Sequence, residues 1–256
     1  MSAVASPAPL LRTQGLVKRY GGLLVTDAVS MEVLPNQVHA IIGPNGAGKT
    51  TLINQLSGEI GSNEGTVWFE GRDVTSLPVS ARARQGLLRS YQITSIFEDF
   101  TVLENATFAA MGARGKGLRF WRPMLADGEL HGVAQKALVD TGLAARADDA
   151  ASALGYGERR QLELAMALAA SPKVLLLDEP MAGMSVQESV AVVALLQRLK
   201  RDYAIVLIEH DMQAVFALAD RISVLVYGRV VASGTPDEIR QDPEVRRAYL
   251  GDEEIA

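Results

Sequence analysis

The sequence predicts an α/β fold in which helices cover both faces of a parallel β-sheet. Three observations indicate this fold: short apolar runs alternate with helical patterns, a glycine-rich segment directly follows one of the runs, and aromatic residues contribute only 5% to a hydrophobic content of 48%. Interiors rich in valine, leucine and isoleucine are typical of parallel sheets. A chain of 256 residues is long enough for the core of one domain, with or without a subdomain.

Four apolar runs are predicted to form the parallel sheet because each is short, rich in leucine or β-branched residues, and bounded by glycine, aspartate or charged residues. They span Val38–Ile42, Val174–Leu177, Ala204–Ile208 and Ile222–Val226. Helical patterns separate most of them, at Thr50–Leu56, Gln187–Leu199 and Met212–Ala219. Such alternation favours a sheet with helices on both faces.

Two other regions depart from this alternation. Closely spaced strand-like segments at Leu10–Val17, Val29–Leu34 and Thr66–Phe69 predict an antiparallel patch at the N-terminal edge. From residue 101 strand signals vanish, and Thr101 with Glu104 forms a capping-box pattern at a helix start. We therefore expect one domain over residues 10–251, with a helical subdomain (99–160) inserted into an α/β core (10–98 and 161–251). Residues 1–9 and 252–256 are expected to be tails.

Composition excludes several classes of function. Thirty acidic residues against 25 basic ones give a net charge of −5, without the positive footprint of a nucleic-acid-binding protein. The chain has no cysteine, which excludes a disulfide framework and a thiolate metal site. The N-terminus lacks the basic and apolar parts of a signal peptide, and no run of about 18 apolar residues predicts a membrane span. We expect a cytoplasmic protein.

A phosphate-binding loop is the strongest motif. The run VHAIIG is followed by PNGAGKTT and a helical pattern, which matches G-x-x-x-x-G-K-[ST] in its strand–loop–helix setting. Glycines let backbone N–H groups converge on phosphate oxygens, and the helix start adds partial positive charge. Lys49 is expected to reach the β and γ phosphates, and Thr50 to bind Mg²⁺. The candidate ATP-binding residues in this loop are Gly43, Pro44, Asn45, Gly46, Ala47, Gly48, Lys49, Thr50 and Thr51.

Further candidate residues follow strand-like runs or flank the insertion. Asp178 ends a buried run and would hold Mg²⁺ through water, while Glu179 would polarise the attacking water. His210 follows the run AIVLIE and would bond a γ-phosphate oxygen and orient the water. Gln92 would contact Mg²⁺ or water through its amide oxygen. Read alone, these residues also fit solvated strand ends, a structural histidine and a surface glutamine.

The segment LGYGE, residues 154–158, begins a long helical pattern with a glycine-punctuated loop. On its own residues it is either an ordinary helix start or half of a ligand site. Together and in this order, GPNGAGKT, Gln92, LGYGE, LLLDEP and EHD closely resemble an ABC-type ATPase over about residues 10–251. The resemblance implies a P-loop NTPase (RecA-like) core with an antiparallel β edge and a helical subdomain. It also implies two cassettes facing head to tail with ATP between them.

Residue by residue, the resemblance assigns further roles. Residues Leu154, Gly155, Tyr156, Gly157 and Glu158 match the signature loop that touches ATP held by the other cassette. The usual form is Leu-Ser-Gly-Gly-Gln, so positions 155, 156 and 158 depart from it. Backbone N–H groups near Gly155 and Gly157 are expected to keep contacting ATP. Tyr20 resembles the aromatic residue that stacks on adenine, with a structural tyrosine as the alternative. Ser185 stands where an aspartate is common, which puts that position's usual role in doubt.

The subgroup is also indicated. LxYGE, SYQITSIFEDFTVLENA, LIEHDM and the tail GTPDEIRQDPEVRRAYLG are similar to ATPase subunits of branched-chain (hydrophobic) amino acid importers. This implies transmembrane permease subunits, a second cassette, an indirect periplasmic binding protein, and a peripheral position inside the cell membrane. Importers of amides, urea or aromatic acids and lipopolysaccharide exporters look alike. A soluble ABC protein of DNA repair or translation, and a cassette that barely hydrolyses ATP, are less favoured alternatives.

Two segments have open interpretations. Ile96, Phe97 and Phe100 either pack inside the helical subdomain or form an exposed apolar groove for a permease helix. The basic segment GARGKGLRFWRPML, at residues 112–125, is either a solvated loop or a contact for anionic headgroups or a permease.

Overall fold

The computed structural model describes residues 7–90, 96–113 and 128–247. Its centre is a six-stranded sheet in which all neighbouring strands are parallel except the β9–β10 pair. In sheet order the strands are β10 (Arg229–Gly234), β9 (Arg221–Val226), β3 (Val38–Ile42), β8 (Ala204–Ile208), β7 (Val174–Asp178) and β6 (Leu87–Ser90). Strands β3, β7 and β8 are buried at every position, as a sheet covered on both faces requires. Their carboxyl ends lie at one edge, where ligands of such sheets bind.

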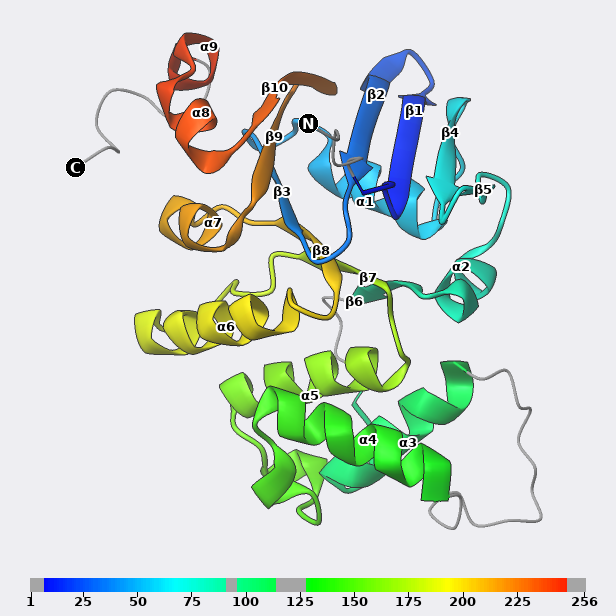
Figure 1. The fold of residues 1–256 in the computed structure, drawn as a ribbon, viewed down its shortest axis with the longest axis vertical. Helices are drawn as coiled ribbons and strands as arrows, with labels where there is room; N and C mark the ends of the chain where they lie inside the picture. The colour runs from blue at the N-terminus through cyan, green and yellow to red at the C-terminus, as the bar shows by residue number, and fades with distance from the viewer. Residues whose placement is uncertain (1–6, 91–95, 114–127, 248–256) are drawn as a thin grey trace, which may run out of the picture.

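A second, antiparallel sheet lies beside the core (Figure 1). Its order is β2 (Leu23–Val33), β1 (Leu11–Tyr20), β4 (Glu64–Phe69) and β5 (Arg72–Asp73). One apolar cluster joins this sheet, the helix after β3 and the face of the central sheet, with Leu16, Leu52 and Phe69 among its fully buried members. The antiparallel patch predicted at the N-terminal edge is therefore confirmed, and it holds the helix that begins at the phosphate loop.

The helices of the core are α1 (Lys49–Ser57), α2 (Val79–Gln85), α6 (Val186–Leu199), α7 (Met212–Leu218), α8 (Pro236–Gln241) and α9 (Pro243–Val245). Side-chain caps fix several of their starts: Ser185 and Glu188 form a capping box on α6, and Asp211 accepts two N–H bonds at the start of α7. Buried Arg82 of α2 donates to the carbonyls of Gln55 and Leu56 at the end of α1. Its cation thus satisfies carbonyls that a helix end leaves without partners.

The helical subdomain consists of α3 (Val102–Ala113), α4 (Gly128–Thr141) and α5 (Tyr156–Ala169), with two short 3₁₀ turns at Ala144–Arg146 and Ala151–Ala153. The three helices lie together below the sheet (Figure 1) and share a core that includes Leu103, Leu138 and Leu162. The capping box predicted at Thr101 is confirmed: its N–H donates to Glu104 Oε2 at 2.7 Å, and Glu104 N–H donates to Thr101 Oγ1 at 3.1 Å.

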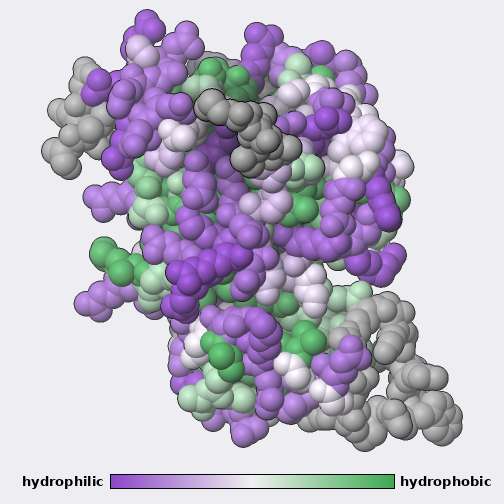
Figure 2. Space-filling view, in the orientation of Figure 1, coloured by the Kyte–Doolittle hydropathy of each residue, from purple (hydrophilic) through white to green (hydrophobic). Residues whose placement is uncertain are grey.

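The structure adds three strands that the sequence patterns did not predict, β5, β6 and β10, and it lengthens others by a few residues. Helix α5 runs to Ala169, so the predicted subdomain boundary at residue 160 lies inside a helix. The predicted tails fall largely outside the described residues. Within the described ranges, each helix is too short or too polar to cross a membrane. On the face shown in Figure 2, hydrophilic side chains predominate and hydrophobic residues form small separate patches.

Candidate nucleotide-binding and hydrolysis site

The phosphate loop connects β3 to α1, and two of its glycines are required by close approach of other strands. Gly43 has φ 149°, and a Cβ there would lie 2.0 Å from the carbonyl oxygen of Leu225 in β9. Gly48 has φ 99°, and a Cβ there would lie 2.4 Å from the carbonyl oxygen of Val25 in β2. Any other residue would push the loop away from both sheets, so these glycines fix where the loop sits.

Lys49 lies inside the phosphate loop rather than in solvent. Its Nζ donates to the carbonyl oxygens of Gly43, at 2.7 Å, and Pro44, at 3.1 Å, and the side chain is buried. Burial lowers the pKa of the Lys49 ammonium, while the carboxylates of Glu179 and Asp178 oppose that shift. The cation is thus positioned where the loop's N–H groups would receive a phosphate.

Asp178 ends β7 beside the loop. Its Oδ2 accepts from Arg89 Nη2 at 3.0 Å, and both side chains are almost fully buried. Burial raises the pKa of the Asp178 carboxyl, and the Arg89 guanidinium opposes that shift. The second oxygen, Oδ1, is buried and has no hydrogen-bond partner among the described residues. A buried carboxylate oxygen without a partner fits a role toward the water shell of a cation.

The described residues contain no cluster of three or more carboxylate, imidazole or thiolate groups able to hold a metal by themselves. Mg²⁺ keeps several waters and is usually bound by one or two protein groups together with substrate phosphates, and the Asp178 Oδ1 is an oxygen of that kind. Thr50 is exposed at the start of α1, open to such a ligand. Gln92, the third predicted metal contact, lies outside the described residues.

Glu179 follows Asp178 at the end of the strand and has an unusual backbone. Its φ is 49°, in the left-handed region that side chains with a Cβ rarely adopt. Its N–H donates to the carbonyl of Ile208 at 2.9 Å, and its Oε1 lies 2.9 Å from His210 Nε2. Because a carboxylate only accepts hydrogen bonds, the imidazole is the donor in this pair. The two side chains meet in a groove of about 550 Å³ between α6 and α7.

The signature-like loop lies at the start of α5. Gly155 is the residue that precedes the helix, and its N–H donates to Glu158 Oε2 at 3.0 Å. Arg146 holds the other oxygen of Glu158 at 2.6 Å, while Leu154 is buried below the loop. In this structure Glu158 accepts the Gly155 N–H, and the expectation that N–H groups near Gly155 and Gly157 contact ATP stays a prediction. Among the described residues, no hydrogen bond or ion pair joins residues 154–158 to the phosphate loop.

Comparison with known proteins identifies the family. The family described as "ABC transporter" matches residues 26–182, which include the phosphate loop, the signature-like loop and the Asp178–Glu179 pair. This chain belongs to the ABC transporter family. The family described as "Branched-chain amino acid ATP-binding cassette transporter" matches residues 229–255. The chain is thus an ATP-binding cassette and an ATP hydrolase.

Relatives match the cassette over nearly its whole length. It is 39% identical over 254 residues to the high-affinity branched-chain amino acid transport ATP-binding protein LivG of Escherichia coli, covering 95% of this chain and 98% of LivG. It is 36% identical over 251 residues to BraF of Pseudomonas aeruginosa, named for the same transport role, with the same coverage of each chain. It is 32% identical over 247 residues to the lipopolysaccharide export system ATP-binding protein LptB of Haemophilus influenzae, covering 95% of this chain and 98% of LptB.

Solved structures confirm the predicted fold. The cassette is similar, with a TM-score of 0.85 and 30% identity, to the ADP conformation of an ATP-binding cassette of an ABC transporter, covering 96% of this chain and 100% of that chain. A nucleotide-free ATP-binding cassette from an ABC transporter gives a TM-score of 0.83 at 29% identity, with the same coverage. The predicted α/β core with its antiparallel edge and helical subdomain is therefore the ABC cassette fold.

Two residues of the site were missed by sequence reasoning. Glu209 is buried, and its carboxylate accepts the N–H of Met181 at 2.9 Å and that of His210 at 3.1 Å. It therefore connects the turn after Glu179 to the segment after β8 that carries His210. Burial raises the pKa of the Glu209 carboxyl, and these N–H groups oppose that shift. Arg89 is the second. Only its place beside Asp178 in the β6–β7 pair reveals its role.

Proposed function

We propose that this cassette powers a membrane importer for branched-chain or other hydrophobic amino acids. The observation that carries the proposal is the match of the C-terminal segment, residues 229–255, to the branched-chain amino acid group. The full-length similarity to LivG and BraF supports it. The remaining alternative is the same ATPase role for a related cargo such as amides, urea, aromatic acids or exported lipopolysaccharide, because LptB is also similar over the full chain.

In the proposed mechanism, the phosphate loop binds the ATP phosphates through its backbone N–H groups and Lys49. Mg²⁺, when bound, neutralises charge that develops on the phosphates; Thr50 would hold it directly, Gln92 through its amide and Asp178 through water. Glu179 accepts a proton from the attacking water. His210 orients the Glu179 carboxylate through the 2.9 Å hydrogen bond. When ATP is bound, His210 would donate to a γ-phosphate oxygen. Tyr20, 50% exposed at the β1–β2 turn, is available to stack on the adenine.

A second cassette completes the site in this proposal. The signature-like loop, residues 154–158, has no hydrogen bond or ion pair to the phosphate loop of its own chain among the described residues. Its location on the helical subdomain, at the N-terminal end of α5, supports contact with ATP held by another cassette. Homodimeric and heterodimeric pairs are both compatible with this geometry.

Permease subunits are the other proposed partners, which places the cassette in the cytoplasm on the inner face of the cell membrane. Phe97 is 42% exposed and Ile96 and Phe100 are partly buried, so the three side chains are not enclosed in the subdomain. Phe97 packs edge-on against Phe108 with ring centroids 4.9 Å apart, and this contact holds the exposed ring in place. A permease helix is proposed to dock here, and a periplasmic binding protein would act through the permeases. The basic segment considered for membrane contact lies mostly outside the described residues.

Copurification and cargo binding test this function. An affinity-tagged full chain, extracted from membranes of its native host in mild detergent, is expected to copurify with two permease subunits and a second cassette. The binding protein encoded with those permeases is expected to bind leucine, isoleucine or valine by titration calorimetry. Copurification with lipopolysaccharide-export components, or a binding protein that prefers urea or amides, would contradict the cargo but leave the ATPase role in place.

A further inference from the structure

A side-chain bond links the signature-like loop to the catalytic turn of the same chain. The hydroxyl of Tyr156 donates to the carbonyl oxygen of Ala182 at 3.0 Å. Ala182 belongs to the turn after β7, and its own N–H donates to the carbonyl of Glu179 at 3.1 Å. One side-chain bond and one backbone bond therefore connect Tyr156, the third residue of the loop, to Glu179.

The ring of Tyr156 is held in place on both sides. The Arg160 guanidinium lies 5.6 Å from the ring centroid, and its Nη1 pairs with Glu163 at 2.8 Å. On the other side Gly183, at φ 77°, leaves room for the hydroxyl: a Cβ there would lie 3.3 Å from Tyr156 Oη. The hydroxyl is thus aimed at the turn by neighbours from α5 and from the turn itself, although Tyr156 is 50% exposed.

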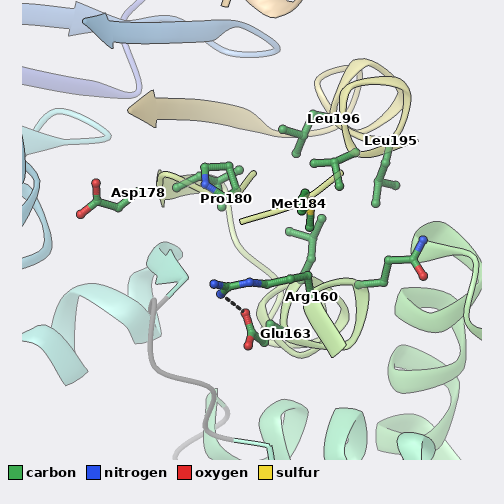
Figure 3. Close-up of a pocket in the computed structure, with 11 residues that line it drawn as sticks. Arg160, Glu163, Asp178, Pro180, Met184, Leu195 and Leu196 are labelled. Atoms are coloured by element: carbon green, nitrogen blue, oxygen red, sulfur yellow. Dashed lines mark hydrogen bonds and ion pairs between the residues drawn. The ribbon is translucent and has the colours of Figure 1, made fainter. Parts of the chain in front are cut away.

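The packing beside this contact is incomplete. A cavity of about 30 Å³ lies between α5 of the helical subdomain and α6 of the core. Figure 3 shows Arg160 and Glu163 on its α5 side, with Met184 and Leu196 on its core side. A space of this size holds little more than a water molecule. Because apolar side chains do not fill the space between α5 and α6 there, packing alone does not fix the position of the loop against the turn. The directional hydrogen bond from Tyr156 helps to fix it.

We propose that Tyr156 is a positioning residue for Glu179, which couples this chain's signature loop to this chain's own hydrolysis site. This inference rests on the proposed second cassette, whose ATP the loop contacts. When the loop is held by that ATP, the hydroxyl of Tyr156 holds the Ala182 carbonyl and so the turn that carries Glu179. Glu179 has a backbone conformation of higher energy, which persists only when neighbouring contacts impose it. Tyr156 contacts no reacting atom and acts only through this turn.

The substitution Tyr156→Phe tests the proposal because it removes the hydroxyl and keeps the ring over Arg160. Steady-state ATPase of the full chain is measured against both ATP and protein concentration, and Mg-ATP-dependent dimerisation is measured by sedimentation in the Glu179→Gln background. The variant loses the 3.0 Å bond to the Ala182 carbonyl and the longer 3.5 Å bond that the hydroxyl accepts from Arg160 Nη2. Loss of the bond to Ala182 predicts a kcat lower by about two- to tenfold. The KM for ATP and the dimer affinity are expected to change by less than about twofold, since neither depends on the Glu179 turn.

Tyr203→Phe is the matched control. Tyr203 is a partly buried tyrosine packed against the apolar core that includes Leu138 and Leu196, and among the described residues its side chain makes no hydrogen bond to the 179–182 turn. The kcat of Tyr203→Phe should equal that of the wild type.

An unchanged kcat in Tyr156→Phe overturns the proposal. So does a fall in dimer affinity that accounts for the whole loss of activity, because the hydroxyl would then act across the dimer. If wild-type turnover is independent of protein concentration, the Glu179→Gln chain forms no ATP dimer at any concentration, and the tagged full chain copurifies with no second cassette, the paired-cassette premise is wrong and the coupling is excluded with it. The premise and the coupling therefore fail with different signatures.

Discussion

Glu179 and His210 follow neighbouring strands, and contacts between these strands hold the two side chains together. The Glu179 N–H bonds to Ile208 at the end of β8, two residues before His210, and the side chains meet at 2.9 Å. Glu209 adds a third tie through the Met181 N–H. These contacts impose the positive φ of Glu179, a conformation that costs about 1–3 kcal/mol in general. The carboxylate is therefore held in place before any nucleotide arrives.

The first prediction concerns this carboxylate. Glu179→Gln keeps the size of the side chain and its contact with His210 but cannot accept a proton. Turnover is expected to fall by about 10²- to 10⁴-fold, the usual contribution of a general base, while Mg-ATP binding stays near the wild-type value. Steady-state ATPase and nucleotide titration measure the two effects. Glu64→Gln, at an exposed carboxylate that begins β4, is the control; a Glu179→Gln variant with near-normal turnover would remove Glu179 from this role.

His39 is a buried histidine outside the catalytic site, and its bonds define one tautomer. Nδ1 lies 2.9 Å from the carbonyl oxygen of Glu32, so Nδ1 carries the proton. Nε2 then accepts from Ser223 Oγ at 2.8 Å, and Ser223 in turn accepts from Ser233 at 2.9 Å. Arg221 donates to Ser233 and is the last member of this series of hydrogen bonds. Burial lowers the pKa of His39 to about 4, and the nearby Arg221 cation acts in the same direction.

The second prediction follows from that pKa. Below the unfolded-state pKa of about 6.5, the unfolded chain binds a proton at His39 that the folded chain does not bind. The stability contribution of His39 is therefore complete above pH 6.5 and is lost as the pH falls toward 4, by about 3 kcal/mol in total. Urea unfolding of His39→Gln should show a flatter pH dependence over this range than the wild type. Parallel wild-type and His39→Gln curves would refute the assignment.

At the scale of elements, the start of α3 determines where Phe97 lies. Buried Asn105 donates through Nδ2 to the carbonyl of Phe97 at 3.0 Å and accepts the Phe97 N–H at 2.8 Å. The Asn105 amide thus bonds to both backbone polar groups of Phe97, as a neighbouring strand would. Phe97 is therefore held at the surface by a fixed backbone rather than by a flexible loop.

The third prediction tests the proposed permease site on this element. Phe97→Ser should reduce copurification of permease subunits by about tenfold or more, since an exposed aromatic anchor at an interface is commonly worth over 1 kcal/mol. ATPase activity of the lone chain should not change, because Phe97 lies away from the phosphate loop. Val139→Ser, at a 64% exposed apolar residue on α4, is the matched control. Equal recovery of permeases with both variants would show that the docking surface lies elsewhere.

Element patterns explain which parts of the fold were predictable. The buried strands β3, β7 and β8 were predicted because each is an uninterrupted apolar run. Strand β10 was missed because it is an edge strand with mostly exposed or partly exposed positions, and polar residues interrupt its pattern. Strand β6 has only four residues, and its membership depends on pairing with β7, which is distant in sequence. Such pairing leaves little local signal.

The site divides in the same way. The phosphate loop, Asp178, Glu179 and His210 could be predicted because each directly follows an apolar strand and carries a residue type suited to phosphate or water chemistry. Arg89 and the contact of Tyr156 with Ala182 depend on side chains that meet only in the folded chain. Glu209 directly precedes the assigned His210, yet its function comes from its burial and its bond to Met181. No spacing of residues in the sequence indicates this burial or this bond.

At the scale of the whole molecule, the two parts of the proposed ATP site lie on different parts of the fold, one on the α/β core and one on the helical subdomain. The phosphate loop lies at the edge of the central sheet, and residues 154–158 begin α5 in the subdomain (Figure 1). In the family's usual signature, a serine hydroxyl at position 155 contacts the γ phosphate across the dimer. Gly155 cannot make this bond, and its N–H is held by Glu158. The first-turn N–H groups of Tyr156 and Gly157, together with the positive end of α5, remain for ATP.

The fourth prediction is that Gly155 makes closure of the paired cassettes weak. A missing hydrogen bond to a charged acceptor is worth about 1.5–3 kcal/mol per site, so the lone chain should be mostly monomeric with Mg-ATP. Gly155→Ser should tighten the ATP dimer by about ten- to a hundredfold per site, most visibly in the Glu179→Gln background, as measured by sedimentation.

The structure accepts this substitution without strain. Gly155 has an extended backbone with φ −67° and ψ 170°, and an added Cβ would meet only Glu158 Oε2, at 3.8 Å. A serine here can also accept the Glu158 N–H and complete a capping box while its own proton is donated to the phosphate. Gly155→Ala occupies the same space without a hydroxyl and separates these effects. If alanine tightens the dimer as much as serine, or if the unmodified chain already forms a tight ATP dimer, the missing hydroxyl does not limit closure.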